Sequence, residues 1–409
     1  MTPNERVTYV QLEARARRVA GALSQRGVRA GDRVALAPAA GSDYCAALHG
    51  CFLLGAVAVP IDLRLAPAER EARLHSAKVV VEGPLHGPSL KGVPRVEIED
   101  VATLMHTSGT TAAPKPVPLS YRNWLANALG SAVALGLDQQ ERWLCPLPLA
   151  HVGGLSVLVR SAIYATTAVL GEGFDAAAVA AALRDPSEPI TLVSVVATML
   201  QRVLDAGLRD PPTLRWALLG GGPIPAGLLE RARARGVPVA PTYGMTEACS
   251  QIATFGWPLP ETELAVSDDG EVLVRGPTVS RAVLSADGWL HTGDLGTLDD
   301  RGKLSLAGRL SDVIVSGGEN VAPVEVEEVL LTHPAVLDAA VYGRPDRDWG
   351  EVVVAVVVPR DGVELHPTEL RAHCAQRLAR FKLPKAFELV DILPRTASGK
   401  LLRRQLGRD

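Results

Sequence analysis

One short segment of the chain carries the residues best suited to hold a run of phosphate groups. Residues 105–120 read M-H-T-S-G-T-T-A-A-P-K-P-V-P-L-S, so hydroxyl side chains surround a glycine and a single lysine follows them. The members of this set are Thr107, Ser108, Gly109, Thr110, Thr111 and Lys115. Backbone N–H groups, hydroxyls and one point charge are what a nucleotide triphosphate requires of a protein. The segment differs from the pattern G-x-x-x-x-G-K-[ST], so it predicts a phosphate loop of another kind.

Further along the chain, two glycine-rich segments could each serve either a binding site or the fold, and a lone histidine such as that of the first is more often structural. His151 stands in P-L-A-H-V-G-G, between a proline-bounded turn and two glycines. Gly220, Gly221 and Gly222 follow the apolar run 215–219. Three glycines at the end of a strand allow a flat ring to approach the backbone, although a tight turn would explain them equally.

Four more segments supply hydroxyls, carboxylates and cations. Residues 243–247 read Y-G-M-T-E and combine an aromatic ring, a hydroxyl and a carboxylate. Asp294 follows a Thr-Gly pair that predicts a turn, and there it could accept hydrogen bonds from both ribose hydroxyls. The segment G-R-L-S-D at 308–312 runs into S-G-G-E-N at 316–320. Lys400 lies on a Ser-Gly turn near the C-terminus.

The elements that position these segments alternate between helices and apolar strands. Helical spacing of apolar residues predicts a helix within 7–35 and another at 44–54, each followed by a strand. Short apolar strands are expected at 191–195 and 215–219. This alternation favours parallel or mixed sheets covered by helices. After about residue 308 the pattern changes to that of a small α+β module of roughly a hundred residues.

Composition sets the remaining limits. A chain of 409 residues predicts two or three domains, and 47% hydrophobic residues can form a large core. Its 42 basic and 45 acidic residues leave a net charge of −3, so neither nucleic acid nor an anionic membrane is the expected partner. No apolar run is long enough to span a membrane and the N-terminus has no leader pattern, so a cytoplasmic protein is expected. The five scattered cysteines form no Cys-x-x-Cys pair and are expected to be reduced and mostly buried.

In this order and at these separations, the seven segments resemble the motifs of the adenylate-forming superfamily. That superfamily comprises acyl-CoA synthetases, peptide-synthetase adenylation domains and luciferases, and the resemblance extends from residues 7–9 to Lys400. Its members use Mg-ATP to convert a carboxylic acid into an acyl-adenylate and then pass the acyl group to a thiol. The resemblance therefore implies ATP, Mg²⁺ and coenzyme A as ligands.

The resemblance also implies a role for each matched residue. The phosphate loop would hold the β- and γ-phosphates, Thr246 would contact the α-phosphate, and Glu247 would help to hold Mg²⁺. Tyr243 would stack on adenine beside Gly244, with Gly220 to Gly222 on the other face. Asp294 and Arg309 would bind the ribose, and Lys400 would serve adenylation. Gly317 and Gly318 would admit the thiol, and Lys382 would contact the phosphates of coenzyme A. Lys400 would act as the main electrostatic catalyst of adenylation.

The family fold implies two domains joined by a pivot. We expect an α/β protein in which residues 1–309 form a large N-terminal domain of mixed sheets covered by helices. Residues 310–312 would form a hinge, with Ser311 at the position that is usually Asp or Lys. Residues 313–409 would form a small mobile α+β lid that carries Lys400 and rotates between the half-reactions.

Several details are most similar to the o-succinylbenzoate–CoA ligases of menaquinone biosynthesis. These details are the short connections, the segment around His151, the Leu-Gly-Gly-Gly-Pro run, Ser-Gly-Gly-Glu-Asn and the Asp348-Trp349-Gly350 triplet. In those enzymes the histidine equivalent to His151 lies near the acyl pocket. A dicarboxylic aryl acid needs a cationic or amide partner for its second carboxylate, and Arg160 and Gln251 are candidates.

Three alternatives stay open at this point. The chain could activate another aryl or short-chain acid, or it could load the pantetheine of a separate carrier protein. It could also bind acyl-adenylates without making them, because the phosphate loop has Ala112 and Pro116 where relatives usually have glycine. Ala112 must adopt the backbone of the usual glycine, and Pro116 removes an N–H donor. A homodimer is also left open.

Overall fold

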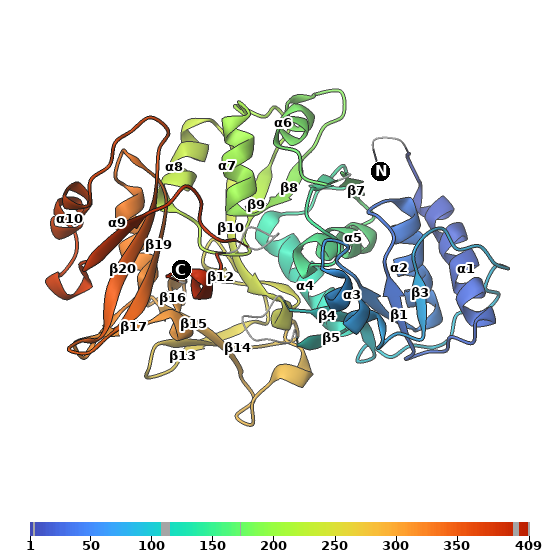
Figure 1. Cartoon of the computed structure of the whole chain (residues 1–409). Helices are drawn as coiled ribbons and strands as arrows, with labels where there is room; N and C mark the ends of the chain where they lie inside the picture. Colours follow the sequence, from blue (N-terminus) through green and yellow to red (C-terminus); the bar gives the residue numbers. More distant parts are fainter. Residues whose placement is uncertain (3–4, 108–114, 172, 396–400, 408–409) are drawn as a thin grey trace.

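The computed structural model describes residues 1–2, 5–107, 115–171, 173–395 and 401–407. Four sheets and their helices follow one another from the blue N-terminal end to the red C-terminal end of the molecule (Figure 1). Three of the sheets belong to a large N-terminal part, and the fourth forms a smaller C-terminal part. The expected fold class, mixed sheets covered by helices with a small α+β domain at the C-terminus, is therefore confirmed.

The first sheet has the strand order β3-β1-β2-β4-β5, in which β5 alone runs antiparallel to its neighbour. Its strands are β1 (Arg33–Leu36), β2 (Val57–Pro60), β3 (Val79–Val81), β4 (Val101–His106) and β5 (Pro116–Ser120). Its helices are α1 (Tyr9–Gln25) and α2 (Ser42–Leu54) on one face and α3 (Pro67–Leu74) on the other. Thr8 begins α1 with a capping box, and Gly55 ends α2 with φ +68°, which turns the chain into β2.

The second sheet has the order β12-β11-β10-β9-β8-β6-β7 and is parallel from β6 to β10. Its strands are β6 (Arg142–Cys145), β7 (Thr167–Leu170), β8 (Leu192–Val195), β9 (Trp216–Leu219), β10 (Val239–Met245), β11 (Ser250–Thr254) and β12 (Trp257–Pro258). Its helices are α4 (Tyr121–Leu135), α5 (Val152–Tyr164), α6 (Ala176–Arg184), α7 (Ala197–Asp205) and α8 (Ala226–Ala234).

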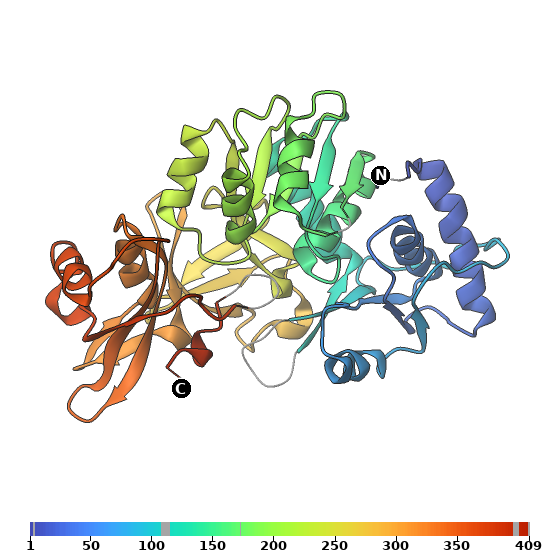
Figure 2. The same ribbon diagram turned by 45° about the horizontal axis from the view of Figure 1, so that its top comes forward.

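Helices cover both faces of this second sheet. Trp143 and Cys145 of β6 pack into the core that includes α5, whereas Leu144 between them packs into the core of α6, α7 and α8. The three green helices accordingly stand together on one side of the sheet in both views (Figures 1 and 2). A parallel sheet buried on both faces needs apolar residues in succession, as β6 and β8 have.

The third and fourth sheets complete the chain. The third is antiparallel and contains β13 (Glu263–Val266), β14 (Glu271–Arg275), β15 (Leu290–Leu298) and β16 (Leu304–Arg309). The fourth contains β17 (Ile314–Ser316), β18 (Glu319–Val321), β19 (Val336–Asp346), β20 (Gly350–Pro359) and β21 (Ala386–Leu389), with α9 (Pro323–Leu331) and α10 (Pro367–Ala375). A single turn of 3₁₀ helix, η3 (Leu310–Asp312), joins the two sheets. Among the helices of the described ranges, none has the length and apolarity to cross a membrane.

Candidate active site

The carboxyl ends of the parallel strands bring most of the candidate residues to one region. His151 follows β6 of the second sheet, and Arg64 follows β2 of the first. The Arg64 Nη2 atom lies 3.1 Å from His151 Nε2, so the carboxyl edges of the two sheets meet there. Ligands of open α/β sheets bind outside the carboxyl ends of the strands. This edge is therefore the candidate active site.

The phosphate loop is described only at its two ends. It connects β4 to the antiparallel β5, and the Thr107 N–H donates to the Lys115 carbonyl oxygen at 3.2 Å. Ser108, Gly109, Thr110 and Thr111, together with Ala112, lie outside the described residues. Pro116 pairs with His106 in β5, the last strand of the sheet order. A proline without an N–H is tolerated in such an edge strand, so Pro116 belongs to the strand rather than to the phosphate-binding turn.

The two residues expected at the ribose, Asp294 and Arg309, are joined to each other and to Tyr243, the residue expected to stack on adenine. Tyr243 OH donates to Asp294 Oδ2 at 2.7 Å, and Arg309 Nε lies 2.7 Å from Asp294 Oδ1. Burial, and secondarily the charge of Asp294, raises the pKa of the Tyr243 hydroxyl, which therefore stays a donor. The carboxylate of Asp294 is thus fixed between β10, β15 and β16 before any nucleotide arrives.

One expectation about this site was wrong. Asp294 does not lie on a Thr-Gly turn but inside the nine-residue strand β15. Gly293 has φ +68° within that strand, and its N–H donates to Glu271 Oε1 at 2.7 Å. The glycine therefore makes a local irregularity of the strand, not a chain reversal, and this irregularity directs the Asp294 carboxylate toward Tyr243.

The glycines predicted to line adenine have different roles. A Cβ on Gly220 would lie 2.8 Å from the Thr242 methyl carbon, and one on Gly244 would lie 1.6 Å from the Ser250 carbonyl oxygen. These two glycines are therefore required by the close approach of neighbouring strands. Gly222, in contrast, has nothing within 4 Å of an added Cβ. Of the glycines after β9, Gly222 thus has the space to face a base.

The segment after β10 is suited to a magnesium–phosphate group. Thr246 and Glu247 lie in the single turn η1 (Thr246–Ala248), and the Ser280 N–H donates to the Glu247 carbonyl oxygen at 2.9 Å. Within the described ranges, no three His, Cys, Asp or Glu side chains gather into a metal site. Mg²⁺ usually takes one or two protein carboxylates and completes its shell with water and phosphate oxygens, so a single Glu247 fits that ion.

A fully buried guanidinium lies beneath this segment. Arg160 of α5 is 1% exposed, and its Nη2 donates to Asn127 Oδ1 while its Nε and Nη1 have no hydrogen-bond partner in the described chain. Its guanidinium carbon lies 5.5 Å from the centre of the Trp143 ring. Desolvation lowers the pKa of Arg160. Gln251, the other candidate for a carboxylate, already donates through Nε2 to Thr254 Oγ1 at 2.8 Å.

The C-terminal residues form contacts that the sequence did not indicate. Lys382, expected to contact the phosphates of coenzyme A, has its Nζ 2.6 Å and 2.7 Å from the two carboxylate oxygens of Glu325. Gly317 has φ +61° and packs so closely on Trp349 that a Cβ would lie 2.7 Å from the indole ring. Gly318 has φ +85° and open space around it. Lys400 lies outside the described residues.

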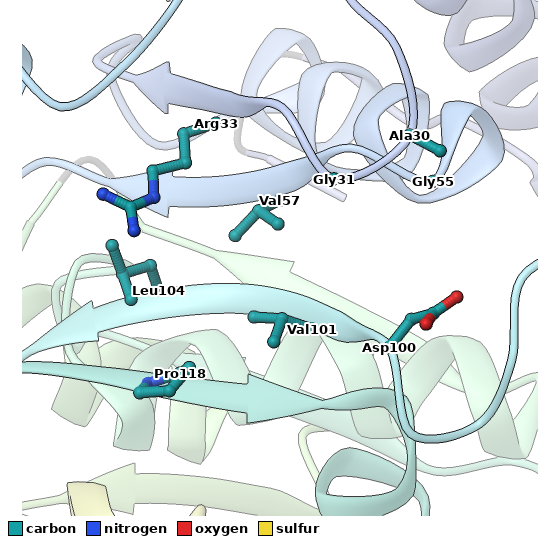
Figure 3. A pocket seen from close by; sticks show the side chains of 9 residues that line it. All are labelled: Ala30, Gly31, Arg33, Gly55, Val57, Asp100, Val101, Leu104 and Pro118. Carbon is teal, nitrogen blue, oxygen red and sulfur yellow. The ribbon is translucent and has the colours of Figure 1, made fainter. Parts of the chain in front are cut away.

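A cavity of about 430 Å³ lies elsewhere in the first sheet. Arg33, Val57 and Val101, the first residues of β1, β2 and β4, line it together with Leu104 and Pro118 (Figure 3). It therefore lies toward the amino ends of the parallel strands, away from the edge that holds His151 and the phosphate loop. We accordingly do not place the active site there.

We expect Asp294→Ala to raise the KM for ATP by about 10- to 100-fold, because hydrogen bonds to a charged group contribute about 1.5–3 kcal/mol. The KM for the acid should change little, because Asp294 is bonded to the residues of the ribose site. Steady-state kinetics with each substrate varied in turn measures both effects. Asp300→Ala, which removes an exposed carboxylate from the hairpin between β15 and β16, is the matched control. Equal KM values for ATP in both variants would refute the ribose assignment.

Comparison with known proteins identifies the family of this chain. The model of the AMP-binding enzyme family matches residues 2–82 and 81–284, and that of the AMP-binding enzyme C-terminal domain matches residues 325–400. The 2-succinylbenzoate–CoA ligase of Bacillus licheniformis is 40% identical over 457 aligned positions, which include 98% of this chain and 95% of the relative. The alignment is longer than the 409 residues of this chain, so it contains gaps in this chain where the relative has additional residues.

Solved structures lead to the same group. The o-succinylbenzoate CoA synthetase of Bacillus subtilis in complex with its acyl-adenylate intermediate superposes with a TM-score of 0.89 at 37% identity, covering 100% of this chain and 94% of the other. The same enzyme in complex with ATP and magnesium ion also gives a TM-score of 0.89 at 37% identity, with 100% and 96% covered. The chain therefore belongs to the AMP-binding, adenylate-forming family of enzymes.

Proposed function

We propose that this enzyme ligates 2-succinylbenzoate to coenzyme A, with ATP as the energy source and an acyl-adenylate as the intermediate. It is an acid–thiol ligase of the AMP-forming type, and the B. licheniformis relative carries the name of this activity over almost the whole length of both chains. The observation within the structure that best supports the choice of acid is the buried guanidinium of Arg160.

A buried positive charge without an anion is costly, so its retention needs an explanation. In the described part of the chain, Arg160 has no ion pair with a carboxylate, and its hydrogen-bonded partner Asn127 is neutral. An anionic ligand that reached this guanidinium would supply the missing charge and accept from the two unpartnered nitrogens, which requires the packing around Arg160 to open. Arg160 is a candidate partner for the carboxylate of a dicarboxylic acid that is not activated.

The position of Arg160 is compatible with this role. It lies on α5, whose N-cap is His151, and its charge acts on Cys249, two residues after Glu247. An acid that pairs one carboxylate with Arg160 would direct the rest of its length toward the segment of Thr246 and Glu247. In this arrangement, Arg160 would select the acid at one end, and the segment of Thr246 and Glu247 would activate it at the other.

The proposed adenylation needs little proton transfer. The carboxylate of the acid is already ionised at neutral pH and attacks the α-phosphate of ATP directly, with pyrophosphate as the leaving group. Mg²⁺ bound with ATP would neutralise part of the negative charge on the phosphates. Asp294 and Arg309 would hold the ribose, Tyr243 would contact the adenine, and Glu247 would help to hold Mg²⁺. Thr246 and Lys400 would stabilise the charge that develops on the α-phosphate.

We further propose the domain boundaries expected from the sequence, with 1–309 and 313–409 pivoting about 310–312. Arg403, just after Lys400 in the chain, supports this division, because its Nε lies 3.1 Å from Asp312 Oδ2 and its Nη1 donates to Glu327. The C-terminal tail is therefore tied to the residue that follows the proposed pivot, Ser311. A rotation about Ser311 would carry the tail and the fourth sheet together.

We assign the thiol step to three residues of the C-terminal part. Gly317 and Gly318 would admit the pantetheine arm, and Lys382 would have to leave Glu325 to meet the phosphates of coenzyme A. Since ATP and coenzyme A are cytoplasmic metabolites, we propose a cytoplasmic location. A homodimer stays a prediction, and a carrier protein as the thiol partner remains the alternative.

The experiment that tests the function is a panel of acids assayed by loss of free coenzyme A thiol. The panel contains 2-succinylbenzoate, benzoate, malonate and the two analogues of 2-succinylbenzoate in which one carboxylate is replaced by a methyl group. We expect the highest kcat/KM for 2-succinylbenzoate. A higher kcat/KM for any monocarboxylic acid would overturn the choice of substrate, and pyrophosphate release without thiol loss would favour a carrier protein.

A further inference from the structure

Asp62, Arg64 and His151 form a hydrogen-bonded chain at the acyl side of the site. Arg64 grips Asp62 in a bidentate ion pair, with Nε 2.9 Å from Oδ1 and Nη2 2.7 Å from Oδ2. The Arg64 backbone N–H also donates to Asp62 Oδ1 at 3.0 Å. The same Nη2 lies 3.1 Å from His151 Nε2. Asp62 is 8% exposed, whereas the Arg64 side chain is 38% exposed, so a buried carboxylate holds a guanidinium that reaches the surface of the site.

The direction of the last hydrogen bond follows from chemistry. A guanidinium has N–H groups and no lone pair to offer, and it does not lose its proton in proteins. Arg64 therefore donates and His151 Nε2 accepts, which requires the lone pair of that nitrogen. A neutral imidazole carries one proton, and with Nε2 as the acceptor the proton must be on Nδ1.

The competing partner of Nε2 is Asp62, and the distances favour Arg64. Asp62 Oδ2 lies 3.4 Å from His151 Nε2, which is longer than the contact with Arg64, and this oxygen already accepts from Arg64 Nη2. Hydrogen bonding to Arg64, with a smaller effect of His151, holds the pKa of Asp62 well below its usual range. Asp62 thus stays a carboxylate that keeps the Arg64 guanidinium in place.

We propose that Arg64, oriented by Asp62, fixes His151 as the Nδ1–H tautomer and so makes it a hydrogen-bond donor to the acyl substrate. Arg64 and Asp62 are in this sense positioning residues. His151 Nδ1 has no hydrogen-bond partner among the described residues, and the side chain is 32% exposed, so the N–H is available to a ligand. The opposite tautomer would present a lone pair to the oxygens of the acid and repel them.

The inference about the tautomer rests on geometry alone, whereas its consequence for catalysis rests on the proposed function. The test therefore has a spectroscopic arm and a kinetic arm. The side-chain ¹⁵N signals of histidine distinguish a protonated nitrogen from one with a lone pair, and each nitrogen couples differently to the ring protons. The chain has nine histidines, so the signals of His151 are assigned by their loss in the variant His151→Gln.

In the unaltered protein we expect the ¹⁵N spectrum to place the His151 proton on Nδ1. In Arg64→Met, the donor to Nε2 is gone and Asp62 Oδ2 becomes its nearest polar neighbour, so the proton should move to Nε2. In Asp62→Asn, Arg64 loses its carboxylate partner but can still donate to Nε2, so the Nδ1–H form should be present at a lower fraction than in the unaltered protein. A protonated Nε2 in the unaltered protein, or a lone pair retained on Nε2 in Arg64→Met, would overturn the proposal. Thermal unfolding of each variant confirms that the spectra come from folded protein.

The kinetic arm asks whether the tautomer matters for the reaction. We expect Arg64→Met to raise the KM for the acid by about tenfold, the upper range for one hydrogen bond, with the KM for ATP changed less than twofold. Asp62→Asn should raise the KM for the acid by less than Arg64→Met does, because Arg64 can still donate to Nε2 without its carboxylate partner. If the pair merely stabilised the fold, both variants would lose activity in proportion to their loss of thermal stability. Reversal of the tautomer without any change of KM would leave the geometry intact and refute the role in substrate binding.

Discussion

Arg160→Met should lower kcat/KM for 2-succinylbenzoate by about 100- to 1,000-fold, because truncating one partner of a buried charge pair costs about 2–5 kcal/mol. Methionine fills a similar volume without a charge. The KM for ATP should stay within twofold, since the residues that we propose to hold the nucleotide lie on β10, β15 and β16. Steady-state kinetics with the acid varied at saturating ATP and coenzyme A measures the loss.

Stability should change in the opposite direction. The guanidinium of Arg160 is 1% exposed and leaves two nitrogens without partners, so its removal relieves a desolvation cost in the free enzyme. Replacing buried charges by apolar residues of similar volume is often neutral or stabilising. We expect the Tm of Arg160→Met to equal or exceed that of the unaltered protein, and Arg160→Lys to keep part of the activity. A lower Tm together with unchanged kcat/KM would mean that Arg160 serves the fold and not the substrate.

The second large effect concerns the tail lysine. Lys400→Ala should slow the formation of acyl-adenylate by about 100- to 1,000-fold, the usual loss when one preorganised donor to a developing negative charge is removed. Transfer of the acyl group from preformed acyl-adenylate to coenzyme A should change less than threefold, because the family resemblance assigns Lys400 to the first half-reaction only. Pyrophosphate release measures the first step, and thioester formation from synthetic adenylate measures the second.

The matched control for this variant is Lys91→Ala, which removes an exposed lysine that belongs to none of the seven motifs. It should leave both half-reactions unchanged. Equal losses of both steps in Lys400→Ala would contradict the assignment of two conformations, since a lysine needed throughout could not belong to one half-reaction alone.

The sequence predicted those parts of the molecule that depend on local order. The helix expected at 44–54 is α2, Ser42–Leu54, because regularly spaced apolar residues and a glycine at the end, Gly55, identify a helix locally. The order of the seven motifs along the chain was likewise enough to recognise the family. The expectation of reduced, mostly buried cysteines is confirmed, since Cys51, Cys145, Cys249 and Cys374 are buried and free.

Contacts between distant segments were missed for a physical reason. Arg64 and His151 are 87 residues apart and meet only because two sheets join at their carboxyl edges, which no local pattern encodes. The signal that could have found Arg64 was an Asp-x-Arg triplet directly after the apolar strand β2. The turn predicted at Asp294 was wrong because a Thr-Gly pair is typical of turns. In the structure, the pairing of β15 with β14 and β16 keeps this segment within a strand.

Lys382 illustrates the same limit. A lysine in a basic segment near the C-terminus is typical of a residue that contacts phosphate. In the structure, however, the ammonium group of Lys382 lies 2.7 Å from a carboxylate oxygen of Glu325 in α9. Arg160 is the opposite case. A single arginine within the otherwise apolar helix α5 was a visible signal, yet only the structure reveals that two of its nitrogens are buried without partners.

The central claim is that the chain makes an acyl-adenylate from 2-succinylbenzoate and then transfers the acyl group to coenzyme A. A rapid-quench experiment with enzyme in excess over ATP, the acid supplied first and coenzyme A second, tests it most directly. We predict that acyl-AMP and pyrophosphate appear together before coenzyme A is added, and that acyl-AMP then decays into acyl-CoA and AMP at equal rates. Formation of ADP and phosphate, or of acyl-CoA without any acyl-AMP, would contradict it.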